Sequence, residues 1–295
     1  MHFRQLRYFV TIARLRHFAQ AASECGVSQP TLSAGLSALE QEVGRRLVER
    51  DRRFIGLTSH GEAMLPWAEQ ILGAISSMTS SVAASAAPIS GEFGLMAIPA
   101  ALPLVGAFGE ALLGQFPALT LSVRSATSRE IERALNAFEC DAGLTYLDHE
   151  PPGNVLSVAL HSERYLFVAR AGAGFEQRSD IDWHEAVAQP LCLLHQGMQF
   201  RRILDARIKA KGLAIAPRAV ADSYVTLFEM VRSAGFCTIV PDTYAPLLAG
   251  LEWARFMPLD GDADGRRIGL VVMNRSPLGP LAGAAMAVAR ELAER

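Results

Sequence analysis

The sequence is poor in cysteine and has no long hydrophobic run. Its four cysteines, Cys25, Cys140, Cys192 and Cys237, each lie more than 40 residues from the next, and no CxxC pair occurs. This spacing argues against a structural zinc site and against a disulfide framework. No stretch of about 18 uninterrupted apolar residues is present, so we expect no membrane-spanning helix. Buried, reduced thiols in a cytoplasmic protein are the simplest interpretation.

The sequence also lacks the short motifs that mark common enzymes. GxSxG, the Walker A loop, GxGxxG and HExxH are all missing, and the seven histidines form no HxxxH pair. These motifs carry nucleophiles, phosphate cradles and metal ligands. We therefore expect no enzyme, no metal site and no cofactor.

Lysine is scarce, because Lys209 and Lys211 are the only two, and arginine supplies the remaining positive charge. Residues 1–60 hold nine arginines against five acidic residues, a net charge of +4, whereas the rest of the chain carries −6. A basic head on an acidic body predicts that one end of the chain meets a polyanion. The length of 295 residues, half of them hydrophobic, suffices for about two domains with buried cores.

The apolar spacing predicts three helices near the N-terminus, the last two joined by a tight turn at Gly26-Val27. Gly26 is a natural C-cap, Ser28 can cap the next helix, and Pro30 fits its first turn. The first helix would bury Leu6, Phe9, Val10 and Ala13, and the last would bury Leu32, Leu36, Leu39 and Val43. This arrangement is typical of a helix-turn-helix, whose second helix reads DNA. From periodicity alone, a helical hairpin in an unrelated core stays open.

The face of this reader helix opposite the leucine stripe is small and polar. Glutamine pairs with adenine in the major groove, and serine or threonine reaches base edges or phosphates. The candidate DNA contacts on this helix are Gln29, Pro30, Thr31, Ser33 and Ser37.

Two short apolar runs, 47–50 and 55–58, flank a basic tip and predict a β-hairpin wing. Arg50, Arg52 and Arg53 would grip phosphates or enter the minor groove. A solvated charged turn is the alternative, but the preceding helix-turn-helix favours the wing.

Six motifs within residues 1–61 come in the order and spacing of LysR-type transcriptional regulators. They are Leu6-Arg-Tyr-Phe-Val, Phe18-Ala-Gln-Ala-Ala, Val27-Ser-Gln-Pro-Thr-Leu-Ser, Leu39-Glu-Gln-Glu-Val-Gly, Leu47-Val-Glu-Arg and Leu57-Thr-x-x-Gly61. The resemblance implies an all-α-type winged helix-turn-helix head at residues 1–58. It also implies double-stranded DNA and RNA polymerase as partners, and a homodimer or homotetramer.

The reader helix departs from that family at one point. Ala34-Gly35 follow Ser33, where the family often has a long polar or basic residue. Base readout there should be weaker, and Gly35 costs the helix about 1 kcal/mol.

Residues 59–90 are predicted to form a linker helix and a hinge. Thr58 or Ser59 can cap the helix, with Glu62 completing a capping box, and Pro88 ends it. A heptad-like seam runs through Leu65, Ala68, Leu72, Ile75, Thr79 and Val82. The seam predicts a dimerising helix, although a helix packed on its own chain stays open.

From residue 91 onward, strands and helices alternate, which predicts an α/β body with parallel sheets. The predicted strands are 94–98, 119–124, 142–147, 155–160, 164–169, 191–194, 236–240, 268–274 and one around Ala219. The predicted helices are one ending at Gln115, 129–138 capped by Ser128, 200–211, 224–233 and one from Leu278. Such sheets bind ligands beyond the carboxyl ends of their strands.

The body resembles the effector domain of LysR-type regulators, which is similar in fold to periplasmic binding proteins. The matching segments are Phe116-Pro117, Asp141-Ala-Gly-Leu, Leu194-x-x-Gly197-x-x-x-Arg201 and Val231-x-x-Ala-Gly-x-x-x-Ile-Val-Pro241. The resemblance implies an effector-binding domain at 91–295, with one lobe of 91–161 and 267–295 and a second of 162–266.

The resemblance also implies an effector between the lobes, held by helix N-termini that suit a small anion. Its candidate contacts are Ala100, Ala101, Ser128, Thr145, Tyr146, Gln199, Phe200, Arg201 and Ser223. Relatives often place a hydroxyl where Ala100 stands, so this site has lost one donor. Arg201 could instead face solvent or form an ion pair within its lobe.

Four further segments resemble a LysR-type subgroup found beside formate dehydrogenase operons, which implies formate or a similar small oxyanion as effector. They are Ala97-Ile-Pro-x-Ala-Leu-Pro, Ser128-Arg-Glu-Ile-Glu, Gly143-Leu-Thr-Tyr-Leu-Asp and Glu150-Pro. Two other functions stay open. A solute-binding protein would fit the body but not the head, and a thiol redox sensor of the same family would need cysteines that meet in space.

Overall fold

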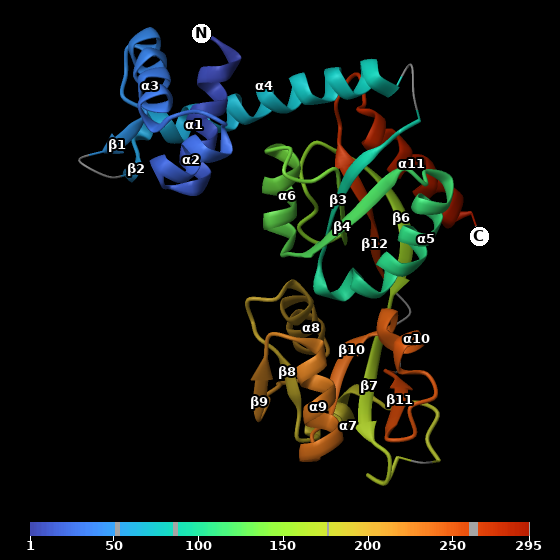
Figure 1. The fold of residues 1–295 in the computed structure, drawn as a ribbon. Coiled ribbons are helices and arrows are strands. Elements are labelled where there is room, and N and C mark those ends of the chain that lie inside the picture. Colours follow the sequence, from blue (N-terminus) through green and yellow to red (C-terminus); the bar gives the residue numbers. More distant parts are fainter. Residues whose placement is uncertain (51–53, 85–87, 176, 260–264, 295) are drawn as a thin grey trace. The chain divides into compact units, whose positions relative to one another are not determined.

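The computed structural model describes residues 1–50, 54–84, 88–175, 177–259 and 265–294. The chain divides into two compact units, one of residues 1–87 with 136–139 and one of residues 88–135 with 140–295. Figure 1 shows a mainly helical first unit and a second unit of mixed helices and strands. Among the described helices, none is both long enough and apolar enough to cross a membrane.

The first unit contains the predicted helix-turn-helix. Its helices are α1 (Phe3–Leu15), α2 (Phe18–Glu24) and α3 (Gln29–Val43). Gly26 has the positive φ of 67° that ends α2, and the Ser28 hydroxyl caps α3 by accepting the Thr31 N–H at 3.3 Å. Three of the four residues of the predicted α3 stripe, Leu32, Leu36 and Leu39, are buried in one core with Phe9 and Ile12 of α1, whereas the fourth, Val43, is half-buried against that core. The fold of the head therefore follows the sequence pattern closely.

Gly35, in the middle of α3, allows a close approach between two helices. A Cβ atom at this position would lie 2.5 Å from Cδ2 of Tyr8 in α1, and Tyr8 is buried. The glycine lowers helix propensity, but it lets the aromatic ring pack directly on the backbone of α3.

The predicted wing is an antiparallel hairpin of β1 (Val48–Arg50) and β2 (Phe54–Leu57). Glu40 of α3 anchors it, because its buried carboxylate accepts the Leu47 N–H at 2.9 Å. The predicted basic tip at 51–53 lies outside the described residues.

Helix α4 (Ser59–Ala84) is capped by Thr58, whose hydroxyl accepts the Gly61 N–H at 3.0 Å. Part of the predicted dimer seam belongs to the head: Ala68 is buried there, and Leu65 and Leu72 pack against the same core. The exposed apolar residues of α4 are Trp67, Ile71, Met78 and Val82, of which only Val82 belongs to the predicted seam. The seam is revised because the first turns of α4 complete the core of their own chain.

The first lobe of the second unit is built on a five-stranded sheet in the order β4-β3-β5-β12-β6. Its strands are β3 (Gly91–Ala97), β4 (Leu119–Ser125), β5 (Ala142–Tyr146), β6 (Val155–Glu163) and β12 (Arg266–Met273). β3 runs parallel to β4 and β5, whereas β12 runs antiparallel to β5 and β6. The predicted all-parallel sheet is wrong for β12, because this strand enters at the edge where the other four end.

Helices cover both faces of that sheet. They are η1 (Pro99–Leu104), α5 (Val105–Gln115), α6 (Ser128–Asn136) and α11 (Pro280–Ala293). Figure 1 shows α6 on one face and α5 with α11 on the other.

The second lobe holds a three-stranded sheet, β10-β7-β11, and a parallel pair, β8-β9. The strands are β7 (Tyr165–Arg170), β8 (Cys192–Leu194), β9 (Ala219–Ala221), β10 (Thr238–Pro241) and β11 (Ala254–Pro258). β7 runs antiparallel to both of its neighbours because it enters from the first lobe. The helices are α7 (Trp183–Ala188), α8 (Gln199–Ala210), α9 (Tyr224–Ala234), η2 (Asp242–Tyr244) and α10 (Ala245–Leu248). The sequence did not predict α7, α10, η1, η2 or β11.

Candidate functional site

The carboxyl ends of β3, β4 and β5 meet the second lobe at a small cavity of about 300 Å³, a volume that includes its open mouth. Because these strands are parallel, the segments that follow them all lie at one edge of the sheet. The first lobe lines the cavity with Ile98, Pro99, Ala100, Thr127, Ser128 and Tyr146. The second lobe adds Leu194, Met198, Gln199, Phe200 and Tyr224.

The hydroxyl of Ser128 faces this cavity because a neighbour takes over the predicted capping role. Thr127 Oγ1 accepts the Glu130 N–H at 3.3 Å, and Glu130 accepts the Thr127 N–H at 2.7 Å, so Thr127 caps α6. Ser128 Oγ is therefore available to contact Thr145 Oγ1 at 2.8 Å and the side chain of Gln199. The prediction of Ser128 as the cap was wrong by one residue.

Tyr224, which the sequence did not indicate, lines the cavity and has an unsatisfied hydroxyl. The side chain is 3 % exposed, and its oxygen has no hydrogen-bond partner among the described residues. Burial, and then the charge of Glu163, hold the pKa of this phenol well above its usual value, so it stays a neutral donor. An unmade hydrogen bond at a buried donor costs about 1–3 kcal/mol, which a ligand with an acceptor would recover.

Backbone donors surround the same cavity. Helices α8 and α9 both begin at it, and neither N-cap residue, Met198 or Ser223, makes a side-chain capping bond. The first N–H groups of a helix have no partner within the helix, and the positive end of the dipole lies there. Two helix starts and several hydroxyl groups therefore lie beside the cavity, although its lining is mostly apolar.

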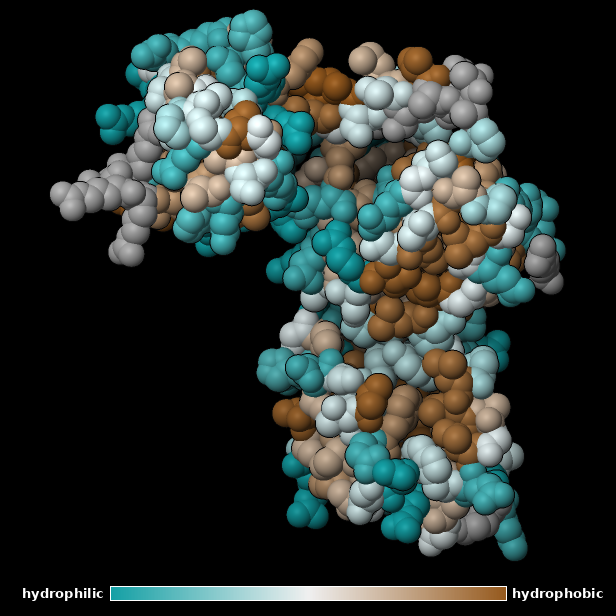
Figure 2. Space-filling view, in the orientation of Figure 1, coloured by the Kyte–Doolittle hydropathy of each residue, from teal (hydrophilic) through white to brown (hydrophobic). Residues whose placement is uncertain are grey.

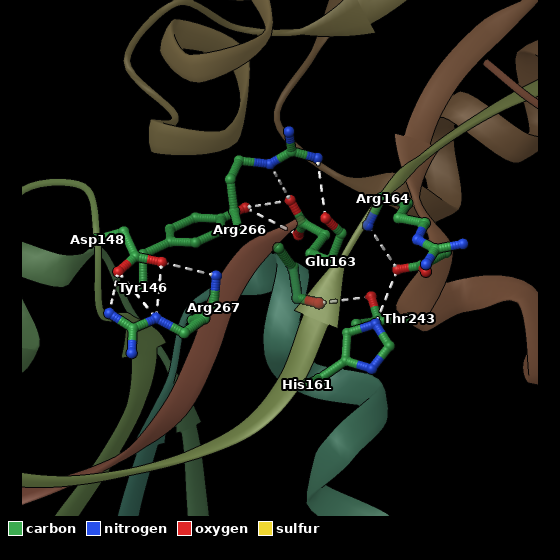
Figure 3. A network of polar contacts seen from close by, with 10 residues as sticks. Tyr146, Asp148, His161, Glu163, Arg164, Thr243, Arg266 and Arg267 are labelled. Carbon is green, nitrogen blue, oxygen red and sulfur yellow. Dashed lines mark hydrogen bonds and ion pairs between the residues drawn. The ribbon is translucent and has the colours of Figure 1, made fainter. Parts of the chain in front are cut away.

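Behind the cavity, Glu163 and Arg266 form a buried ion pair where the chain passes between the lobes. Arg266 Nε lies 3.1 Å from Glu163 Oε1, and both side chains are buried, with 6 % and 0 % exposed. The two residues end β6 and begin β12, and they face each other across these strands. Tyr146 Oη donates to Glu163 Oε2 at 2.9 Å (Figure 3). The pair therefore fixes a residue that lines the cavity.

Aromatic rings extend this network toward the cavity from the other lobe. The Arg266 guanidinium lies 3.7 Å from the ring centroid of Tyr165, the first residue of β7. Tyr165 packs edge-on against Phe200 with centroids 5.7 Å apart, and Phe200 packs likewise against Tyr224 at 6.0 Å. The ion pair of Glu163 with Arg266, where the chain passes between the lobes, and the wall of the cavity are thus joined in one packed cluster of side chains.

Charged and polar pairs surround the buried one in Figure 3. His161 Nε2 lies 2.8 Å from Asp242 Oδ1, and this hydrogen bond raises the pKa of His161. Arg267 Nε donates to Asp148 at 3.0 Å, which lowers the pKa of that carboxyl. Thr243 Oγ1 donates to the carbonyl of Ala100 at 2.7 Å across the lobes.

Five of the nine predicted effector contacts line the cavity: Ala100, Ser128, Tyr146, Gln199 and Phe200. Four others, Ala101, Thr145, Arg201 and Ser223, are not among its lining residues.

Two of those four have clear positions. Thr145 reaches the cavity only through Ser128. Arg201 is 2 % exposed and bonds to Asp205 at 2.7 Å and to the Leu194 carbonyl at 2.8 Å, the ion pair within its lobe that the sequence left open.

The predicted DNA contacts at the start of α3 differ in exposure. Gln29, Pro30 and Thr31 are exposed, whereas Ser33 and Ser37 are half-buried. Figure 2 shows mostly hydrophilic residues on the head around α3 and the N-terminus. Arg50 ends β1, and Arg52 and Arg53 lie outside the described residues.

The thiols lie away from the cavity. Cys140, Cys192 and Cys237 are buried, Cys25 is half-buried, and none of these four forms a disulfide bond. Burial raises the pKa of Cys237 to about 11 and raises that of Cys192, so these two are poor thiolates at neutral pH. Among the described residues, no group of three or more His, Cys, Asp or Glu side chains could hold a metal ion.

Family comparisons match both units. Residues 3–62 match the family described as "Bacterial regulatory helix-turn-helix protein, lysR family", and residues 86–294 match the "LysR substrate binding domain".

Two curated relatives cover most of the chain. A "Probable hydrogen peroxide-inducible genes activator" of Mycobacterium avium is 31% identical over 275 residues, covering 92% of this chain and 88% of that protein. The "DNA-binding transcriptional dual regulator OxyR" of Escherichia coli is 26% identical over 279 residues, covering 94% of this chain and 91% of that protein.

Solved structures show the same fold. A cysteine-to-aspartate variant of full-length OxyR from Pseudomonas aeruginosa superposes with a TM-score of 0.81 at 23% identity, covering 99% of this chain and 94% of that one. Full-length CbnR complexed with its target DNA superposes with a TM-score of 0.70 at 22% identity, covering 99% and 100%.

The buried carboxyl of Glu163 should make stability depend on pH. Burial outweighs Arg266 and raises its pKa from 4.5 to about 7 in the folded state. An acid whose pKa is raised on folding stabilises fully below its unfolded pKa and loses that stabilisation as the pH rises through its folded pKa. Between about pH 5 and 7 the unfolding free energy of wild type should fall, relative to Glu163→Gln, by roughly 1 kcal/mol per pH unit.

Urea denaturation at several pH values measures this difference. His161 adds a loss in the same direction, because its pKa is also raised, and His161→Gln removes that share. Parallel pH profiles for wild type and Glu163→Gln would show that Glu163 is ionised throughout.

Proposed function

The chain belongs to the LysR family of bacterial transcriptional regulators, and we propose that it couples DNA binding by its head to a small effector held between the lobes of its body. As a DNA-binding regulator with an effector-binding domain, it acts through binding rather than catalysis. An effector can change DNA binding only if the two conformations of the regulator bind it with different affinities. A cavity lined by both lobes meets that requirement, because opening the lobes would separate its walls.

For the head, we propose that the start of α3 contacts bases and the wing contacts the backbone. Gln29 and Thr31 are exposed at the N-terminal end of α3, the end from which a recognition helix reaches base edges. Gln29, Pro30, Thr31, Ser33 and Ser37 form the proposed reading surface, and Arg50, Arg52 and Arg53 the phosphate or minor-groove contacts.

The exposed stripe of α4 supports a homodimer. Trp67, Met78 and Val82 are 67%, 61% and 69% exposed, and Figure 2 shows hydrophobic residues along α4. Such a stripe on one helix is typical of an interface with a second helix. A pair of heads would read two half-sites, and a dimer of dimers is the larger assembly that we propose for the full chain.

For the body, the buried and unpaired hydroxyl of Tyr224 carries the proposal of an effector. Ser128 and the starts of α8 and α9 add further donors beside a cavity whose lining is otherwise mostly apolar. Donors without matching acceptors suit a small anion. Formate, or a carboxylate of similar size, is the effector that we propose.

The names of the relatives favour a second candidate, a thiol that responds to peroxide. The raised pKa values of Cys192 and Cys237 oppose it, because peroxide reacts with the thiolate. No cysteine lines the cavity. We therefore favour a bound effector over a peroxide-reactive thiol as the signal. Peroxide is still among the compounds to be tested.

Two substitutions at the head should have different signatures. Gln29→Ala should weaken binding to the specific site by about 1–3 kcal/mol and leave non-specific binding unchanged. Arg52→Ala and Arg53→Ala should weaken all sequences alike, and each should reduce the salt slope by about 1. Fluorescence anisotropy at several salt concentrations measures both; a double arginine variant equal to wild type at every concentration refutes the wing contact.

A charge on the exposed stripe of α4 should weaken the dimer. Met78→Asp would place a carboxylate in an apolar interface, whereas Gln70→Asp adds the same charge at an exposed polar position of the same helix. Light scattering of the full chain at micromolar concentration should show fewer subunits for Met78→Asp and no change for Gln70→Asp. A monomeric wild type would contradict the proposed assembly.

Small oxyanions should bind the full chain through Tyr224. Calorimetry with formate, nitrate, sulfate and C2–C4 carboxylates tests this, and a ligand at 100 times its dissociation constant should stabilise by about 2.7 kcal/mol. Tyr224→Phe should weaken binding about tenfold or more, and without ligand it should be at least as stable as wild type, because it removes a buried donor that has no partner among the described residues.

Ser223→Ala serves as the comparison, because Ser223 does not line the cavity. Equal affinity of wild type and Tyr224→Phe would refute the site. Oxidation of Cys192 or Cys237 by peroxide with a matching change in DNA binding would establish the second candidate instead.

A further inference from the structure

The side chain of Gln199 lies in the cavity between the lobes. It is the first residue of α8, in the second lobe, and it is 8% exposed. Its amide nitrogen donates to the carbonyl oxygen of His149 at 2.7 Å, and its amide oxygen accepts from the hydroxyl of Ser128. Both partners belong to the first lobe, so the lobes cannot separate without breaking both hydrogen bonds.

The chemistry of the partners fixes which group donates and which accepts in each of the hydrogen bonds that connect His149, Gln199, Ser128 and Thr145. A carbonyl oxygen only accepts, so the Gln199 nitrogen must face His149 and its oxygen must face Ser128. Since Ser128 gives its proton to Gln199, Thr145 donates to Ser128 across the 2.8 Å between their hydroxyl oxygens. The amide thus uses a donor and an acceptor of the first lobe, as a bound small molecule would.

We propose that the Gln199 carboxamide is an internal ligand, which holds the lobes together until an effector displaces it from Ser128. The holding role stands on the contacts of Gln199 alone, and the displacement rests on the function proposed above. A carboxamide and a formate ion are both planar groups of three heavy atoms, so an effector of this size can replace the amide in place.

The replacement also defines the effector that binds best. A plain carboxylate accepts from Ser128 and from Tyr224, but it leaves the His149 carbonyl without its donor. A carboxylate that also carries a hydroxyl can satisfy both partners. Glycolate should therefore bind more tightly than propionate, which has the same number of heavy atoms, by roughly the fivefold to tenfold of one hydrogen bond.

Other contacts across the lobes lie at the edge of the cavity. Thr243 holds the Ala100 carbonyl, and Tyr244 Oη donates to the Pro99 carbonyl at 2.9 Å. Arg202 Nη2 lies 3.0 Å from Glu150 Oε2 with both side chains exposed, and such surface pairs contribute little. Arg202 is on the same helix as Gln199, which makes it a matched control.

Hydrogen–deuterium exchange of the full chain without effector tests the internal ligand. Gln199→Ala should raise the exchange rates at residues 127–135 and 142–149 roughly tenfold, because two buried hydrogen bonds are lost. Arg202→Ala should leave these rates unchanged. Gln199→Glu keeps the acceptor for Ser128 but has no donor for His149 at neutral pH, so it should fall between the two, and it carries the test if Gln199→Ala does not fold.

Chemical rescue makes the test specific. Gln199→Ala lacks the carboxamide group, and acetamide carries the same group as a free molecule. Added acetamide should therefore restore slow hydrogen exchange in this variant and leave the exchange of wild type unchanged. Acetate has the same shape with two acceptors, and it should restore less than acetamide.

The two proposals fail separately. Equal hydrogen exchange rates in Gln199→Ala and wild type would overturn the proposal that Gln199 is an internal ligand, whichever anions the wild type binds. Weaker binding of anions to Gln199→Ala than to wild type also overturns it, because a competitor weakens binding and a direct contact strengthens it. A wild type that binds no small oxyanion, while Gln199→Ala exchanges faster, contradicts the effector proposed above and supports the holding role.

Discussion

The buried ion pair between Glu163 and Arg266 stands where both connections between the lobes pass. Glu163 ends β6, Arg266 begins β12, and the two strands are paired up to that point. Taking both charges out of water is expensive unless their geometry is well supported. Tyr146 in the first lobe and the ring of Tyr165 in the second give that support, so the ion pair is held from both lobes.

That constraint explains why the cavity lies where it does. The parallel strands of the first lobe end at the crossover, and β12 starts from it, so the loops after β3, β4 and β5 all face the second lobe. Tyr146 contributes one side to the cavity and gives its hydroxyl to Glu163. A ligand that shifts Tyr146 would therefore act on the ion pair directly, which is a short physical route from the cavity to the lobes.

The head solves a different problem, because a small domain has little core. It uses the first turns of α4 as part of that core, through Ala68 and the neighbouring leucines. The same helix then presents Trp67 and Met78 to its surroundings. One helix thus completes a domain and offers a surface to a partner, and its two stripes are offset by about one helical position.

The two lobes were implied by the resemblance to LysR-type effector domains, whereas the amino-acid sequence by itself indicated the helices of the head and most of the strands and helices of the body. These features rest on local signals, such as the Ser28 cap, the leucine stripe of α3 and the strand–helix alternation, whose physics acts within a few residues. It also indicated five residues that line the cavity, because helix starts after strands are visible in sequence.

Only the tertiary structure decided what depends on distant partners. Gly35 is explained by the ring of Tyr8, and the direction of β12 by the return of the chain from the second lobe. The pair of Glu163 with Arg266 joins residues 103 positions apart, and the hydroxyl of Tyr224 is unpaired among the described residues only because of the packing around it; no local pattern marks either feature. Burial gives such groups their chemistry, and burial is a property of the packed chain.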